Sequence, residues 1–408
     1  MATVVLVGTL DTKGIEYAYL RDRLLEHAVD VLVVDAGIHE PIGLEPDIPR
    51  DEVARAGGAE AAELGARGDR GAAVAAMAAG AAQVVTRLHA EGRLDAILAL
   101  GGSGGSAIAT KAMRGLPVGV PKLMVSTLAS GDTRPYVGAV DVTMMYSVVD
   151  ISGVNRVSAR IMANAAAAAA GMALATVPTL EAKPLVAATM FGVTTPCVTR
   201  ARERLEELGY EVLVFHATGA GGQSMEALAA GGFLAGVLDA TTTELADEVV
   251  GGVLSAGPNR LEAAGAAGVP QVVSLGALDM VNFGPRETVP PQFDGRNLYV
   301  HSPTVTLMRT TPDECAELGR RIGAKLSAAK GPTALFIPLG GISMIAVPGQ
   351  PFHDDAADEA LQAGLRETLD PAVEVHERTE EINDPAFATA MADRLHELIG
   401  AALHGEVR

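Results

Sequence analysis

The chain has 408 residues, 49% of them hydrophobic, and this length predicts two or three domains. With 50 acidic and 31 basic residues its formal net charge is −19, which argues against nucleic acid and anionic membrane surfaces as partners. The two cysteines, Cys197 and Cys315, stand far apart without neighbouring histidines, so no metal site is predicted.

The chain runs directly into a strand-like segment at residues 4–7, without a basic leader region or a cleavage site, so a cytoplasmic protein is expected. Its most membrane-like run, residues 162–175, is built of alanine and too short to span a bilayer. We expect this run to form a helix buried between layers of the protein.

Short apolar runs alternate with amphipathic runs from the first residues onward. This alternation is typical of a parallel sheet covered by helices on both faces. The helices predicted in the first half lie at 15–27 and 71–91, and the insertion between residues 38 and 70 carries one short helix that starts near Pro49. The strands predicted there are 4–7, 31–34, 94–100 and 122–126.

A second pass of the same pattern begins near residue 185. His216 follows a strand at 212–215 as Asp35 follows the strand at 31–34, and Gly-Val-Pro precedes a strand at both 119–121 and 268–270. We therefore predict an α/β fold with two Rossmann-like, doubly wound parallel-sheet domains related by a pseudo-repeat. The predicted bounds are 1–180 and 181–380, followed by a docking helix within 381–408.

The glycine-rich run after the strand at 94–100 is the sharpest candidate for a binding loop. Ligands of parallel sheets bind beyond the carboxyl ends of the strands, glycines admit close approach, and free amides at a helix start attract anions. The alternative is a tight turn that requires positive φ. The run consists of Gly101, Gly102, Ser103, Gly104, Gly105 and Ser106.

The same run spells Gly-x-Ser-x-Gly, the nucleophile elbow of α/β-hydrolases, with Ser103 at its apex. A serine hydrolase is therefore an alternative interpretation. A Walker A loop is excluded because the next lysine, Lys111, lies inside the following helix. Acids and histidines that could complete a triad follow at Asp239, Asp279, His301 and His353.

Other loops of the first half offer further nucleotide-binding groups. Lys13 could neutralise a phosphate, Asp35 could contact a ribose hydroxyl or serve as a turn residue, and Arg134 could clamp an anion. The residues predicted to bind the cofactor on these loops are Thr9, Asp11, Thr12, Lys13, Asp35, Ser130, Gly131 and Arg134.

In the second half, His216 and Arg309 are the candidate catalytic residues, expected to face the reactive end of the nucleotide. His216 stands at a strand end, before a second glycine-rich loop at 218–224 that opens a helix. Arg309 lies just before Thr311, which with Glu314 forms the capping box of a predicted helix.

Four segments carry a resemblance to a known family: Gly-Thr-Leu-Asp-Thr-Lys-Gly at 8–14, the glycine run, Ser-Thr-Leu-Ala-Ser-Gly at 126–131, and Val-Val-Asp-Ile-Ser-Gly-Val-Asn at 148–155. Together they resemble the ATP-binding-domain family of the tomato mosaic virus resistance protein over nearly the whole chain. The resemblance implies two Rossmann-like domains, ATP binding in the first, and homodimers. It implies no antiviral binding, because this chain stops before the barrel domain of the plant protein.

The leading hypothesis is an ATP-binding enzyme of small-molecule metabolism, using ATP, with or without Mg²⁺, and a small-molecule substrate in the cleft between the halves. A non-catalytic protein that senses nucleotides through partner contacts is the second hypothesis.

Overall fold

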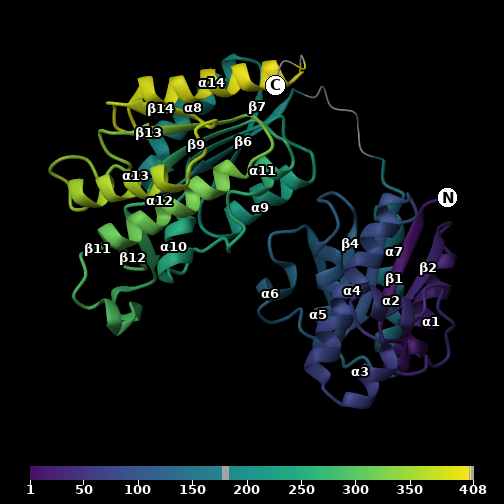
Figure 1. Ribbon diagram of the computed structural model, residues 1–408. Coiled ribbons are helices and arrows are strands. Elements are labelled where there is room, and N and C mark those ends of the chain that lie inside the picture. Colours follow the sequence, from purple (N-terminus) through teal and green to yellow (C-terminus); the bar gives the residue numbers. More distant parts are fainter. Residues whose placement is uncertain (177–182, 404, 406–408) are drawn as a thin grey trace. The chain divides into compact units, whose positions relative to one another are not determined.

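The computed structural model describes residues 1–176, 183–403 and 405. The chain divides into two compact units, Met1–Pro178 and Thr179–Arg408 (Figure 1). The boundary predicted at residues 180 and 181 lies outside the described residues. Helices and strands alternate through both units, as the sequence pattern predicts.

The first unit contains one sheet whose five strands are all parallel. They follow the order β2-β1-β3-β4-β5, so the chain leaves β1 toward one edge and continues from β3 toward the other. The inner strands β1 and β3 are almost entirely apolar because both faces of the sheet are covered. The strands are β1 (Thr3–Gly8), β2 (Asp30–Asp35), β3 (Ala96–Gly101), β4 (Lys122–Ser126) and β5 (Val142–Tyr146).

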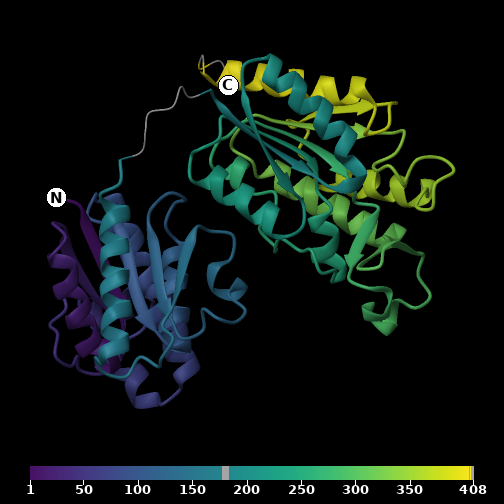
Figure 2. The ribbon, with the colours of Figure 1, turned by 180° about the vertical axis from the view of Figure 1, so that it is seen from behind.

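Helices cover both faces of this sheet. Helices α1 (Leu10–Leu25) and α7 (Arg156–Ala173) pack on one face, where Figure 2 shows α7 lying along the strands. The alanine-rich run at 162–175 was predicted to form a helix buried between layers. The helix is confirmed as part of α7, but only one of its faces is buried, where small side chains such as Ala165 and Ala169 let it lie close to the sheet, while Ala167 and Gly171 are exposed. The opposite face carries α2 (Arg50–Ala56), α4 (Arg70–Ala90) and α5 (Ser103–Arg114), while α3 (Ala61–Arg67) and the short α6 (Arg134–Val137) lie in connections.

Helix α4 is, among the described residues, the one helix long and apolar enough by composition to cross a membrane. Met77, Ala81 and Val84 on α4 are buried in the core of the first unit, as in the core helix of a globular domain.

The predicted loop at residues 8–14 is wrong in its extent, because α1 already begins at Leu10. The Thr9 carbonyl accepts from the amides of Thr12 and Lys13, which closes the first turn directly after β1. Lys13 itself departs from helical geometry, with φ −129° and ψ 16°, so the first turn is kinked. Thr9 to Lys13 are therefore held on a helix start rather than on a free loop.

The second unit repeats this topology in a larger parallel sheet of order β14-β13-β9-β8-β6-β7. Starting from β7, its first five strands reproduce the order of the first unit, which confirms the predicted pseudo-repeat and doubly wound fold. Each strand pairs in parallel with its neighbours. The strands are β6 (Leu185–Met190), β7 (Glu211–His216), β8 (Gly236–Thr241), β9 (Gln271–Gly276), β13 (Thr333–Pro338) and β14 (Glu374–Arg378).

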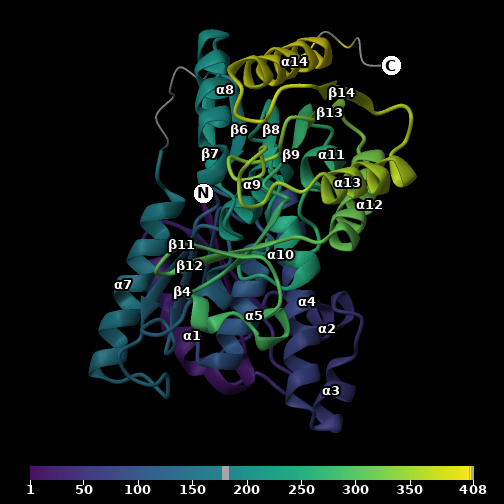
Figure 3. The ribbon, with the colours of Figure 1, turned by 90° about the vertical axis from the view of Figure 1, so that its left-hand side faces the viewer.

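The C-terminal helix α14 (Pro385–Leu403) docks on the second unit. It packs beside α8 (Thr195–Glu207) on one face of the sheet, where Phe387, Met391 and Leu395 are fully buried. The other face carries five helices, of which α12 and α13 lie side by side (Figure 3). They are α9 (Ala220–Ala230), α10 (Glu244–Val250), α11 (Ala263–Ala266), α12 (Pro312–Ser327) and α13 (Asp355–Thr368).

A small antiparallel sheet of order β10-β12-β11 was not predicted. Its strands are β10 (Met280–Phe283), β11 (Leu298–Ser302) and β12 (Val305–Arg309). The strands are only four or five residues long, and their pairing depends on tertiary contacts rather than on local pattern. Single 3₁₀ turns occur at Gly192–Thr194, Arg286–Thr288 and Pro291–Phe293. The capping box of α12 is confirmed, with the Glu314 amide 3.2 Å from the Thr311 hydroxyl.

Candidate functional site

A pocket of about 590 Å³ opens at the carboxyl edge of the first sheet. The segments that follow β1, β2 and β3 line it together. In the order β2-β1-β3, the connections from β1 and β3 leave toward opposite edges, which creates the crevice where open α/β sheets bind ligands. The fold therefore places this pocket where open α/β sheets bind ligands.

The glycine run forms the floor of the pocket at the start of α5. The amides of Ser103, Gly104 and Gly105 donate to no acceptor among the described residues, whereas the Ser106 amide bonds the Gly102 carbonyl at 2.8 Å. Gly102 caps α5 without any side-chain hydrogen bond. Three free amides at a helix start are suited to an anion, because the helix dipole favours negative charge there.

Close packing explains Gly101, where a Cβ would lie 3.0 Å from the Gly105 Cα, but positive φ explains none of these glycines. None of the residues 101–105 adopts positive φ, so the alternative of a strained turn has no support in the geometry. A Cβ built on Gly104 would first meet the Arg70 guanidinium at 3.5 Å and Val74 at 3.8 Å, and one on Gly102 would meet Thr127 at 3.7 Å. At Gly102 and Gly104 a Cβ would thus make only ordinary contacts, and its absence leaves the free amides accessible to a ligand.

Charged groups of both signs surround this floor. Arg70, at the first turn of α4, places its guanidinium against Gly104. The Lys13 ammonium bonds the Ile151 carbonyl, at the rim formed with Asp150. The Asp11 carboxylate accepts from the amides of Ile38 and His39 at 3.0 and 3.1 Å, and so fixes the loop after β2.

Part of the pocket lining is apolar. Leu64 from α3, Val74 and Met77 from α4, and Ile108 from α5 all line the pocket. A small ligand with an anionic end and a flat apolar body would find a matching surface for each part.

The structure brings together most of the residues predicted for the cofactor. Those that line the pocket are Thr9, Asp11, Thr12, Lys13, Gly101, Gly102, Ser103, Gly104 and Gly105. Asp35 does not, because its buried carboxylate accepts from the amides of Leu10 and Gly37 at 3.1 and 2.8 Å. Burial, opposed by these amides, raises the pKa of Asp35 to about 6. Ser106 is also buried, with its hydroxyl 2.7 Å from that of Ser126.

The predicted loop at Ser130, Gly131 and Arg134 lies outside the pocket lining. The Arg134 side chain is 90% exposed and pairs with Asp132 at 2.9 Å on its own loop. It therefore belongs to the surface of the first unit.

The pocket residues that sequence reasoning missed come from the insertion and the helix after it: His39, Leu64, Arg70, Val74 and Met77. The one local signal was Asp69, which caps α4 by accepting from the Ala72 amide and so fixes where Arg70 begins the helix.

Ser103 lines the pocket, but the structure records no hydrogen bond from its hydroxyl to a histidine among the described residues. Two of the acids considered for a triad are engaged elsewhere in the second unit. Asp239 bonds the Arg260 guanidinium and Asp279 bonds Ser343. Among the described residues no base is bonded to the Ser103 hydroxyl.

His216 and Arg309 lie in the second unit, and no contact joins them among the described residues. His216 is exposed at the end of β7, with its ring 5.6 Å from that of Phe191. Arg309 is buried, donates to the carbonyl of Phe352 at 2.7 Å and pairs with Asp358 at 2.9 Å. These bonds tie β12 to α13 and its preceding loop.

No group of three or more histidine, cysteine or carboxylate side chains that could hold a metal ion occurs within residues 1–176, 183–403 and 405.

Fold and pocket together define a two-unit α/β protein with a glycine-lined pocket at the switch point of its first parallel sheet. The chain belongs to the uncharacterised protein family UPF0261: the model of the N-terminal domain matches residues 2–178, and that of the C-terminal domain matches 183–399. The resemblance seen in the sequence motifs is thereby confirmed.

Two relatives show how far the similarity extends. The chain is 55% identical to a UPF0261 protein of Clostridium tetani, over 96% of this chain and 98% of that protein. It is 44% identical to the ToMV resistance protein Tm-1(GCR237) of Solanum lycopersicum, over 78% of this chain but only 43% of the tomato protein. Among solved structures, MurG of Acinetobacter baumannii aligns over 97% of this chain and 95% of its own, with 12% identity and a TM-score of 0.23, too low to support a functional comparison.

Proposed function

We propose that the first unit binds a nucleotide, with ATP as the leading candidate. The observation that carries this proposal is the row of free amides at Ser103, Gly104 and Gly105, beside glycines at 102 and 104 that neither positive φ nor a close backbone approach requires. A phosphate group would accept from these amides at the positive end of the α5 dipole.

The remaining pocket fits the rest of a nucleotide. Arg70 supplies a cation next to the amides, and an arginine–phosphate bond is a strong charge-assisted contact. The apolar wall of Leu64, Val74 and Met77 suits a base, and about 590 Å³ lies within the range of small-ligand sites. Any Mg²⁺ would arrive with the phosphates.

The activity built on this site is proposed to be an ATP-dependent reaction of a small molecule, in a cytoplasmic homodimer. Binding of ATP without turnover of any acid, amine or phosphate acceptor would instead favour a nucleotide sensor. The resistance named for the tomato relative is not proposed here, because this chain aligns with less than half of that protein.

Replacing Gly104 with valine tests the proposal. The new Cβ stands at ordinary contact distance from Arg70 and Val74, so the unit should fold, but the two methyl groups would fill the space beside the amides. Loss of one charge-assisted hydrogen bond costs about 1.5–3 kcal/mol, so calorimetry should show ATP affinity at least about tenfold weaker.

Gly171→Val is the matched control, because Gly171 is also helical and a Cβ there meets nothing within 4 Å. This control should keep wild-type affinity. Unchanged ATP affinity in a folded Gly104→Val variant would exclude the glycine run as the phosphate site. Failure of the wild type to bind ATP in millimolar titrations would reject ATP as the ligand.

A further inference from the structure

The pseudo-repeat gives the glycine run of the first unit a counterpart in the second. Leu6 of β1 pairs with Leu98 of β3, and Ala188 of β6 pairs with Leu238 of β8. Counting along the chain from Leu98 and from Leu238 places Gly104 and Glu244 at the same position, just beyond the carboxyl end of equivalent strands. Where the first unit leaves space, the second carries a carboxylate.

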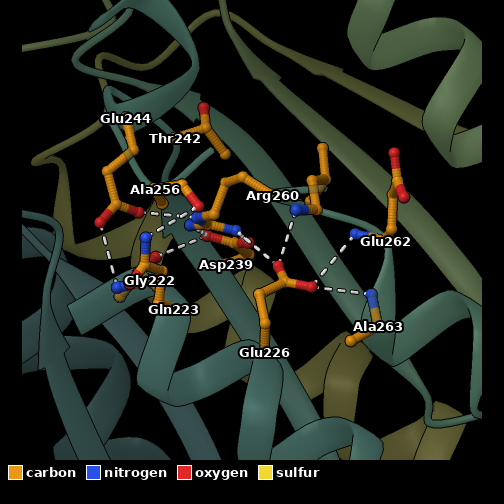
Figure 4. Close-up of polar contacts among 12 residues, drawn as sticks. Gly222, Gln223, Glu226, Asp239, Thr242, Glu244, Ala256, Arg260, Glu262 and Ala263 are labelled. Carbon is orange, nitrogen blue, oxygen red and sulfur yellow. Dashed lines mark hydrogen bonds and ion pairs between the residues drawn. The ribbon is translucent and has the colours of Figure 1, made fainter. Parts of the chain in front are cut away.

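The carboxylate of Glu244 is fully buried and accepts from three donors, of which Gly222 and Arg260 are labelled in Figure 4. Its Oε1 accepts from the amides of Gly219 and Gly222 at 2.7 and 3.0 Å, at the start of α9. Its Oε2 accepts from Arg260 Nε at 2.6 Å. Two amides of a helix start and a guanidinium are the groups that bind a free carboxylate or phosphate elsewhere in proteins.

The backbone around these donors is shaped to admit a carboxylate. A Cβ on Gly222 would lie 2.1 Å from Glu244 Oε2, so glycine is required there for space. Gly219 adopts φ +84°, which a residue with a side chain rarely does, and this conformation turns its amide toward Glu244. The glycine-rich loop at 218–224 is thereby explained as a cradle for an internal anion.

Arg260 has its own anchors and does not depend on Glu244. Its Nη2 donates to Asp239 Oδ1 at 2.7 Å, and its Nη1 lies 3.3 Å from Glu226 Oε1. Asp239 is in turn bonded by the Thr189 hydroxyl at 2.7 Å. Removing the Glu244 carboxylate should therefore leave the cradle in place with its donors unpaired.

We propose that Glu244 is a built-in ligand that occupies the anion site of the second unit. A free anion cannot enter this cradle while the Glu244 carboxylate occupies it. Resting on the proposed function, this predicts one nucleotide per chain. When Glu244 is replaced by alanine, the vacated cradle should bind a small carboxylate such as formate or acetate.

Thermal unfolding of the whole chain tests the proposal. Glu244→Ala should melt several degrees below the wild type and regain most of that loss as formate rises through the millimolar range, but not in sodium chloride of equal ionic strength. Glu244→Gln should melt lower without recovery, because its amide fills the cradle. Leu238→Ala, an apolar cavity in the same unit, is the matched control and should not respond to formate.

The same response to formate in Glu244→Ala and Leu238→Ala would overturn the proposal. If Glu244→Ala does not fold in buffer, refolding from urea in formate should restore it, and refolding in neither salt would equally overturn the idea.

Calorimetry with ATP separates this inference from the proposed function. One site per wild-type chain supports both, and two sites refute the built-in ligand. No ATP binding refutes the proposed function alone, since rescue by formate does not depend on a nucleotide.

Discussion

Replacing Arg260 with methionine would remove the centre of the buried charge network in the second unit. The guanidinium is fully buried and bonds three carboxylates, those of Asp239, Glu244 and Glu226 (Figure 4). These carboxylates belong to β8, α10 and α9, respectively. Methionine has a similar length and no charge, so the change leaves these carboxylates without their shared partner.

The expected loss of stability follows from this burial. Removing one partner of a buried ion pair costs about 3–5 kcal/mol of unfolding free energy. Because Asp239 and Glu244 are at most 1% exposed, we expect a loss within this range in Arg260→Met. Burial raises the pKa of Glu244, and Arg260 opposes that rise. Without Arg260 the pKa of Glu244 should rise further. A raised carboxyl pKa costs stability above that pKa, so the difference from wild type should shrink as pH falls from 7.5 to 5.

Urea unfolding of the full chain at several pH values measures this difference. Arg204→Met is the matched control, because Arg204 pairs with Asp393 and Glu207 at the surface and should contribute less than about 1 kcal/mol. A loss below 1 kcal/mol at pH 7.5 in Arg260→Met, or a loss that does not change with pH, would refute the reasoning.

Two further changes probe the first unit. Because the pKa of Asp35 is raised to about 6, its ionisation should lower stability as pH rises from about 4 to 6, by up to about 1.4 kcal/mol per pH unit. Asp35→Asn should remove this slope from the urea unfolding of the first unit, and an unchanged slope would show that Asp35 does not cause it. Ser103→Ala should weaken ATP binding by about 1 kcal/mol, a several-fold change in calorimetry. Complete loss of turnover with intact affinity would instead identify Ser103 as a nucleophile.

The sequence alone determined the fold class and placed the candidate site at the carboxyl edge of the first sheet. Strand and helix patterns are local, and in a parallel sheet the segments that follow the strands gather at one edge. The segments at Thr9 and Gly101 could therefore be placed together from the sequence. The equivalence of Asp35 and His216 likewise followed from two similar strand ends.

Tertiary structure decided what each side chain does at that edge. The sequence left Asp35 open between a ribose contact and a turn residue, and it made Arg309 a candidate catalytic residue. The fold engages Asp35 with two backbone amides and Arg309 with a carbonyl and a carboxylate. Partners so distant in sequence leave no periodic signal, because only the packed fold brings them within hydrogen-bonding distance.

The same reason explains the difference between the two glycine-rich loops. The glycines of residues 101–106 and 218–224 show that both loops allow an anion to approach their backbone amides. The sequence of neither loop indicates whether those amides are free. That depends on Glu244 and Arg260, which the loop at 218–224 meets only when β8, α9 and α10 pack together. The composition of a loop determines whether its backbone amides can bind an anion. The long-range packing around the loop determines whether a side chain of the protein already occupies those amides.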